Sequence, residues 1–375
     1  MKIKTITCHN VYNYGATLQA YALQTYLESL GHQVEIIDYY PRYRNKKNFW
    51  KIPNNSKVGK YSQKYFLFHL LYATHRALKY FRDTNFDRNK KFDEFDRKYL
   101  HITSTKYTSY QQLKDNPPIA DFYIAGSDQI WNPQGDTGKD PAFFLNFGDT
   151  HTKRISYAAS FGISEIEESF KANLKEYLRV LDVISVREKT GLDILNDLGY
   201  TDAIKVCDPV FLLSKDQWLN ISSPSLVHED YILVYDFFQD DDNIKKMAQK
   251  LAEEKKCRIV SVNDGGRCRY ADFNISNASP NDFVSLIAYA NVVVSNSFHA
   301  TAFSLILNKE FYTFPVDRNK NHSRMIDLLN SVGLSDRFNA SISSLAADID
   351  WMDINEKITC QIDSSKVFLA NLNNY

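Results

Sequence analysis

The sequence predicts an α/β protein built from two doubly wound parallel-sheet domains. Short apolar runs typical of buried strands alternate with helical patterns along nearly the whole chain, which indicates parallel sheets covered by helices. The chain has 375 residues, of which 44% are hydrophobic and 24% charged, enough for two domains with real cores. We place the boundary in the polar stretch 214–230 and expect domains over 1–215 and 216–375.

In the first domain, continuous or alternating apolar runs predict the strands. The predicted strands are 3–9, 34–38, 122–125, 155–159, 183–186 and 206–212. Helical periodicity predicts helices over 16–30, 166–180 and 189–198. Segment 42–100 breaks the alternation, and we interpret it as a helical insert with helices over 61–81 and 89–99. It holds 16 Lys and Arg against five Asp and Glu, a net charge of +11, while the rest of the chain is correspondingly acidic.

The second domain repeats the alternation of strands and helices. Its predicted strands are 231–237, 258–263, 292–295 and 311–316, and its predicted helices are 241–255, 280–290, 300–308 and 323–332. The C-terminal tail after about residue 340 is expected to pack back on the first domain.

Composition excludes several classes of protein. Neither GxGxxG nor GxxxxGK[ST] is present, so the usual dinucleotide fingerprint and the P-loop are both missing. No apolar run is long enough to span a bilayer, and the N-terminus does not look like a secretory signal. The five cysteines lack CxxC spacing. We therefore expect reduced thiols in a cytoplasmic protein, with neither a disulfide framework nor a zinc cage. No cofactor and no metal-ligating residues are predicted, and the sequence leaves a metal requirement open. The zero net charge argues against a nucleic-acid partner.

Ligands of open α/β sheets bind at the carboxyl ends of the strands, so the turns that follow strands are the candidate site. Four such turns carry polar, charged or glycine residues, and Arg324 opens a later helix. These residues are Asn13, Tyr14 and Gly15; Gly126, Ser127 and Asp128; Arg187; and Asn296, Ser297 and His299. Each also has a structural interpretation, as a turn glycine, a helix cap or one partner of an internal ion pair.

Seven stretches along the chain form an ordered set of motifs: YNYGATLQAYAL, IAGSDQIWN, YAASFG, SVREKTG, CDPVFLL, SNSFHATAFSLILNKEF and SRMIDLLNSVGL, spread from about Asn10 to Arg337. This ordered set resembles the polysaccharide pyruvyl transferase family. Segment 42–100 and the tail after about residue 340 carry no such resemblance.

The resemblance implies a glycosyltransferase-B-like architecture, with two Rossmann-type domains facing each other across a cleft. It also implies phosphoenolpyruvate as donor and a sugar or lipid-linked oligosaccharide as acceptor, which receives the pyruvyl group as a ketal. Arg187 matches the family's arginine of the first domain. His299 matches the histidine of the family's Arg-x-His motif, and Ser297 stands where that motif has arginine.

On this basis we expect His299 to be the general acid and Asp128 the base or sugar-orienting group. Donor-binding residues would be Arg187, Asn296, Ser297, Arg324 and Ser127, and acceptor or cleft-lining residues would be Asn13, Tyr14, Gly15 and Gly126. Two alternatives stay open: a nucleotide-sugar-dependent glycosyltransferase, and a non-catalytic family member that binds a glycan. The basic segment 42–100 is either a solvated helical lid or a peripheral contact with the inner face of a membrane.

Overall fold

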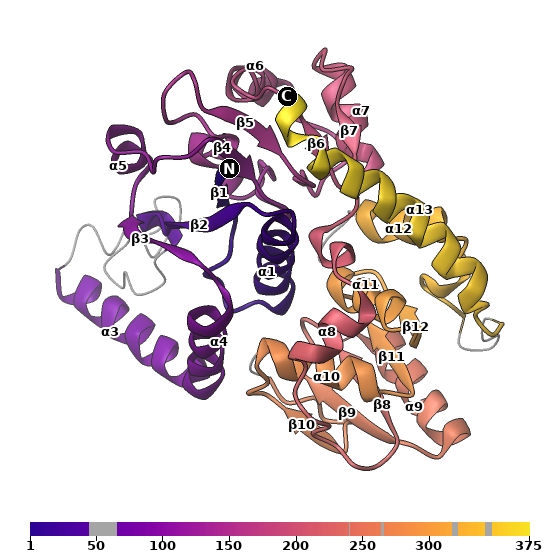
Figure 1. Cartoon of the computed structure of the whole chain (residues 1–375). Helices are drawn as coiled ribbons and strands as arrows, with labels where there is room; N and C mark the ends of the chain where they lie inside the picture. The colour runs from indigo at the N-terminus through magenta and orange to yellow at the C-terminus, as the bar shows by residue number, and fades with distance from the viewer. Residues whose placement is uncertain (45–65, 240, 264–265, 317–321, 342–346) are drawn as a thin grey trace.

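The computed structural model of the chain describes residues 1–44, 66–239, 241–263, 266–316, 322–341 and 347–375. Two five-stranded parallel sheets, one in each half of the chain, are flanked by helices (Figure 1). This confirms the predicted α/β class with two doubly wound sheets.

The first sheet has the order β3-β2-β1-β4-β5. Its strands are β1 (Lys2–Ile6), β2 (Gln33–Tyr39), β3 (Ile102–Tyr107), β4 (Phe122–Ala125) and β5 (Lys153–Ser156), and a short parallel pair, β6 (Ser185–Val186) and β7 (Ile204–Lys205), continues beyond β5. The helices of this half are α1 (Tyr14–Ser29), α3 (Phe66–Asp83), α4 (Phe86–Tyr99), α5 (Tyr110–Asp115), α6 (Glu168–Leu178) and α7 (Lys189–Asp197).

The second sheet repeats this topology in the order β10-β9-β8-β11-β12. Its strands are β8 (Tyr231–Tyr235), β9 (Arg258–Val262), β10 (Phe273–Ile275), β11 (Val292–Ser295) and β12 (Glu310–Thr313). The helices that follow the first half are α8 (Lys215–Ile221), α9 (Asp242–Lys255), α10 (Pro280–Tyr289), α11 (Phe298–Ile306), α12 (Ser323–Val332) and α13 (Trp351–Ala370). In both sheets the order reverses beside the first strand, between β1 and β4 and between β8 and β11. Such reversals open a crevice at the carboxyl ends of the strands.

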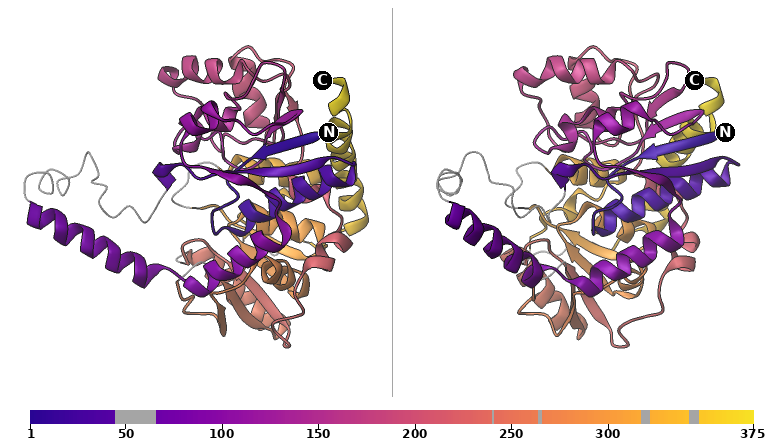
Figure 2. Two further views of the ribbon diagram at one scale, coloured as in Figure 1. Left: turned by 60° about the vertical axis from the view of Figure 1, so that its left-hand side comes forward. Right: turned by 90° about the vertical axis from the view of Figure 1, so that its left-hand side faces the viewer.

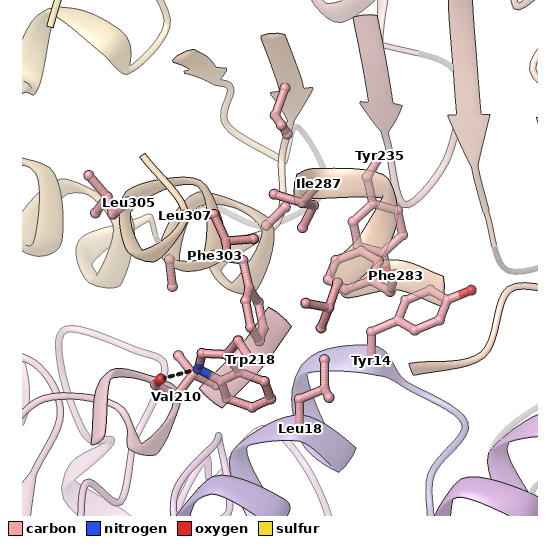
Figure 3. Close-up of a cluster of buried hydrophobic side chains, with 14 of the residues drawn as sticks. Tyr14, Leu18, Val210, Trp218, Tyr235, Phe283, Ile287, Phe303, Leu305 and Leu307 are labelled. Carbon is pink, nitrogen blue, oxygen red and sulfur yellow. Dashed lines mark hydrogen bonds between the residues drawn. The ribbon is translucent and has the colours of Figure 1, made fainter. Parts of the chain in front are cut away.

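The two halves share an aromatic core (Figure 3). Tyr14, the first residue of α1, stacks on Phe283 of α10 with ring centroids 4.4 Å apart, and its hydroxyl donates to the Ala278 carbonyl at 3.1 Å. The indole of Trp218 packs edge-on against Phe303 of α11. These contacts fix the N-terminal end of α1 against the second sheet's helices, so both contribute to the same region.

Helix α13 runs along both halves of the molecule (Figure 1). Its early residues Ile354 and Ile358 belong to the core around the second sheet, whereas Phe368 and Leu369 pack with Ile3 and other residues of the first. The Ser365 hydroxyl also accepts a hydrogen bond from the Cys207 backbone N–H at 2.9 Å. The end of the chain therefore packs on both sheets.

Several expected elements differ from the structure. The predicted strand 206–212 is wrong: Pro209–Leu212 form a 3-10 helix whose preceding residue Asp208 accepts from the Val210 N–H with its carboxylate. The sequence patterns missed β3 and β10 because edge strands are short or half exposed, and they missed α5, α8 and α13. In the insert, α3 and α4 lie near the predicted helices, and positions 61–65 of the first prediction lie outside the described residues.

Over the part of the chain described, no helix has the length and apolar character required to cross a membrane.

Candidate active site

A cavity of about 240 Å³ lies where the two sheets' carboxyl ends face each other. Three of its lining residues are N-caps of helices: Asn13 for α1, Ser297 for α11 and His322 for α12. The Asn13 and Ser297 side chains accept from the N–H groups of Ala16 and Ala300, which explains why the helices begin there. Free N–H groups and the positive ends of three helix dipoles thus converge on one cavity, an arrangement that favours anions.

His299 lies in the floor of this cavity as the second residue of α11 and is 7% exposed. Its ring packs directly on Gly15, where a Cβ atom would lie 1.9 Å from the imidazole Nδ1. Only glycine therefore fits at this point of α1. The other ring nitrogen, Nε2, is buried without a hydrogen-bond partner among the described residues and lies 3.6 Å from the Asp208 carboxylate.

Asp208 is the functional candidate that sequence reasoning missed. It follows β7, is fully buried, and its Oδ2 is approached by Arg187, by the Ser127 hydroxyl at 3.1 Å and by His299. The sequence did contain an indication: Asp208 is followed by a proline inside an apolar run. A continuous buried strand would leave the Asp208 carboxylate unpaired, so the pattern argues against such a strand. Instead the run turns at Asp208 and places the carboxylate beneath the cavity.

Arg187 is buried behind the cavity wall and does not line it. Its side chain is 2% exposed, contacts Asp208, and lies 3.6 Å from Asp128 and 3.9 Å from Glu188. Burial lowers the pKa of Arg187, but the three carboxylates outweigh burial and raise it, so the guanidinium stays charged. Together with Arg324 and a protonated His299, Arg187 and the three carboxylates would form a cluster of six charged groups with zero net charge.

The carboxylates of the cluster are held ionised. Burial alone would raise the pKa of Asp208, but Arg187 and His299 outweigh burial and hold it well below its ordinary value. The pKa of Asp128 is likewise lowered, because Arg187, His299 and Arg324 outweigh its burial. Asp128 also has a φ of 74°, the left-handed region that a non-glycine residue rarely adopts, so its backbone is strained at the cavity wall.

Arg324 reaches the cavity from the N-terminal turn of α12. It lies 3.9 Å from Asp128, and its guanidinium lies over the Phe298 ring, 5.8 Å from the centroid. On the same ring, Arg187 lies 4.6 Å from the centroid. Burial and the neighbouring Arg187 lower the pKa of Arg324 to about 10, against the opposing effect of three carboxylates, so it remains a cation at neutral pH.

Two aromatic side chains after β8 form another wall. Phe237 and Phe238 line the cavity and are 40% and 45% exposed. Their loop is fixed, because the Phe237 N–H donates to Asn296 Oδ1 at 3.1 Å and Asn296 Nδ2 donates to Asp236 Oδ1 at 2.7 Å. Asn296 thus serves as a buried link between the aromatic wall and the start of α11.

The structure brings together most of the residues predicted for the site. Those that line the cavity are Asn13, Asp128, Asn296, Ser297, His299 and Arg324. Arg187 and Ser127 lie beneath it, and Gly15 supports His299. Two expected cleft-lining residues do not line it: Tyr14 is buried in the aromatic core, and Gly126 packs on Thr7 of the neighbouring strand end. Within the described residues, no group of three His, Cys, Asp or Glu side chains has an arrangement that could hold a metal ion.

The two parallel sheets, with a cavity at their carboxyl ends, define a two-domain α/β protein of the glycosyltransferase-B-like class. The sequence model of the family described as polysaccharide pyruvyl transferase matches residues 13–318, most of the chain. The protein therefore belongs to the polysaccharide pyruvyl transferase family. None of the curated proteins compared with it matches significantly in sequence.

Solved structures with a similar fold share little sequence with this chain. The UDP-GlcNAc 2-epimerase of Methanocaldococcus jannaschii, solved with UDP-GlcNAc and UDP, is 11% identical, with 100% of both chains covered and a TM-score of 0.51. The UDP-GlcNAc 2-epimerase of Neisseria meningitidis is 10% identical over 99% of this chain and 94% of its own, with a TM-score of 0.48. A functionally uncharacterised Klebsiella pneumoniae protein is 17% identical over 68% of this chain and 86% of its own, with a TM-score of 0.38. At such identities the likeness concerns the fold alone.

Proposed function

We propose that the protein transfers the pyruvyl group of phosphoenolpyruvate onto two hydroxyls of a sugar, forming a ketal and releasing phosphate. The observation that carries this proposal is the convergence of three helix N-termini, Arg324 and His299 on one cavity. Phosphoenolpyruvate carries a phosphate and a carboxylate, and both need such donors. A buried imidazole beside them supplies the acid that the enol carbon requires.

In the proposed first step, the protonated imidazole of His299 donates a proton to the methylene carbon of phosphoenolpyruvate, and C2 becomes an oxocarbenium-like centre. The first sugar hydroxyl forms a bond to C2 and passes its proton to Asp128, whose ionised carboxylate lines the cavity. The second hydroxyl then attacks C2, the bond from C2 to the phosphate oxygen breaks, and phosphate leaves with the electron pair. One hydroxyl proton returns to His299 and the other departs on phosphate, so the enzyme ends as it began.

Arg324 can replace the arginine that the family motif has at position 297, where this chain has a serine. In the family motif an arginine precedes the histidine by two residues, whereas here Ser297 caps α11 and is buried. Arg324 lines the same cavity from α12 and can supply the missing planar cation to a carboxylate or phosphate. We propose that it is the donor clamp of this chain, with Arg187 acting from below by holding Asp208.

The aromatic wall suits the acceptor. Sugar rings present flat apolar C–H faces that pack on aromatic rings, and the rings of Phe237 and Phe238 are partly exposed inside the cavity. Asp128 and Asn13 also line the cavity and offer oxygens to sugar hydroxyls. We propose that the acceptor sugar lies between these walls, with its hydroxyl pair toward His299.

The test is phosphate release from phosphoenolpyruvate in the presence of a panel of methyl glycosides and disaccharides, with proton NMR to detect the ketal methyl group. We expect release that depends on a sugar and that Arg324→Ala abolishes, while Arg179→Ala, a change at an exposed arginine, leaves it unchanged. Transfer from a UDP-sugar without turnover of phosphoenolpyruvate would contradict the proposal and favour a glycosyltransferase. Tight binding of phosphoenolpyruvate without turnover on any glycan would favour a non-catalytic role.

A further inference from the structure

Helix α12, which carries Arg324, is fixed to the second half of the chain by one of its faces. At about 100° per residue, Met325, Leu329 and Val332 lie within an arc of about 60°. All three side chains are buried in the core around the second sheet. Figure 2 shows the strands and helices of that sheet, in salmon and orange, packed below the first half in both views. The opposite face of α12 is polar.

This polar face of α12 contacts the first half of the chain. Asp327 Oδ2 accepts hydrogen bonds from Lys205 Nζ at 2.8 Å and from the Lys189 backbone N–H at 3.2 Å. The Thr190 hydroxyl donates to the Ser323 hydroxyl at 3.4 Å. Lys189 and Thr190 are the first two residues of α7, and Lys205 ends β7. One carboxylate of the second half therefore links two elements of the first.

Helix α7 does not receive a cap from its own N-cap residue. The Glu188 side chain makes no capping hydrogen bond. Its Oε1 accepts instead from the Ser160 hydroxyl and from the N–H groups of Phe161 and Gly162. The N–H groups of a first helical turn need acceptors, and the helix dipole favours a carboxylate there. Asp327 supplies this carboxylate from the other half of the chain.

We propose that Asp327 is a positioning residue for the donor clamp: by capping α7, it holds α12 against the first half and sets Arg324 at the cavity. Arg324 and Asp327 are three residues apart on α12, so they lie on the same face. Arg324 reaches to 3.9 Å from Asp128 of the first half. The proposal rests on the proposed function in one respect, that Arg324 binds the donor.

Hydrogen exchange of the full chain, followed by mass spectrometry without any ligand, tests the cap. In Asp327→Ala, the first turn of α7 should exchange about tenfold faster, because the Lys189 N–H loses its charged acceptor. Asp327→Asn keeps an oxygen acceptor and should retain part of the protection. The matched control is Asp336→Ala, which removes an exposed carboxylate just beyond α12 and should exchange as the wild type does.

The kinetics of phosphate release test what the cap does for the donor. Asp327→Ala should raise KM for phosphoenolpyruvate about tenfold, because Arg324 is no longer held in place. It should change kcat by less than about threefold, since His299 and Asp128 remain. A loss of stability alone would not raise KM. Asp336→Ala should keep both constants at their wild-type values.

Two outcomes would overturn the proposal. One is exchange in the first turn of α7 that Asp327→Ala leaves unchanged. The other is an unchanged KM in this variant when the wild type turns over phosphoenolpyruvate. Absence of turnover in the wild type would count against the proposed function instead, and the exchange result, which needs no ligand, would still decide whether Asp327 caps α7.

Discussion

The imidazole of His299 can occupy its position only because Gly15 has no side chain. Because a Cβ at Gly15 would lie 1.9 Å from Nδ1, Gly15→Ala must push the imidazole away from its place beside Asp208. We expect activity to fall about 10²-fold or more, since displacements of about 1 Å carry such costs. Gly135→Ala is the control, because its Cβ would meet only ordinary contacts from 3.5 Å outward. Equal activity of the two variants in phosphate release would contradict this account of Gly15.

Removal of the imidazole itself tests its role as the acid. General acid catalysis typically contributes about 10²–10⁴-fold, so His299→Ala should lower kcat by that factor. The fold should survive, because the change leaves a polar cavity floor and no unpaired charge deep in the core. His101→Ala, at an exposed histidine paired with Glu28, should leave kcat unchanged. Near-wild-type turnover of His299→Ala would remove this residue from the mechanism.

The buried carboxylate of Asp208 should make the free energy of unfolding depend on pH. Its pKa in the folded protein is lowered, so its contribution to stability is present above its unfolded pKa of about 3.9 and is lost as pH falls toward the folded value. Asp208→Asn leaves Arg187 with an incompletely compensated buried charge and should cost about 3–5 kcal/mol near neutral pH. In urea unfolding, the gap between wild type and variant should therefore shrink below about pH 4. A gap independent of pH would show that Asp208 is not ionised in the fold.

Among the elements, α13 joins the two sheets by its two ends. Leu369 is fully buried against the first sheet, whereas Val367, two residues earlier, is 59% exposed. Leu369→Ala should lower the free energy of unfolding by about 2–5 kcal/mol, since it leaves a cavity in a packed core. Val367→Ala should change it by less than about 1 kcal/mol. Similar losses for the two variants in urea unfolding would mean that the C-terminal end of α13 is not part of the core.

The strands that the sequence predicted correctly are those buried on both faces. Val292–Ser295 and Phe122–Ala125 are continuous apolar runs because helices cover both sides of the sheet, and their predicted bounds agree with the structure. β3 was missed because four of its six residues are polar and three are exposed at the sheet edge. The turn residues Asp128 and His299 could be found from the sequence, because they follow strands whose carboxyl ends the sequence predicts and ligands of parallel sheets bind at such ends. Asp208 could not, because its role depends on Arg187 and His299, which meet it only in the folded chain.

For the whole molecule, the identity of the anion that fills the cavity is the deciding question, and ligand-induced stabilisation answers it. A ligand at about 100 times its dissociation constant adds about 2.7 kcal/mol to the free energy of unfolding, which raises the melting temperature by several degrees. We expect this shift with phosphoenolpyruvate and not with UDP. Arg324→Ala should abolish it, because the change removes the arginine that lines the cavity, while Arg179→Ala should keep it. A shift with UDP alone would mean that the three helix N-termini bind a nucleotide diphosphate, and that Ser297 marks a change of donor within the family.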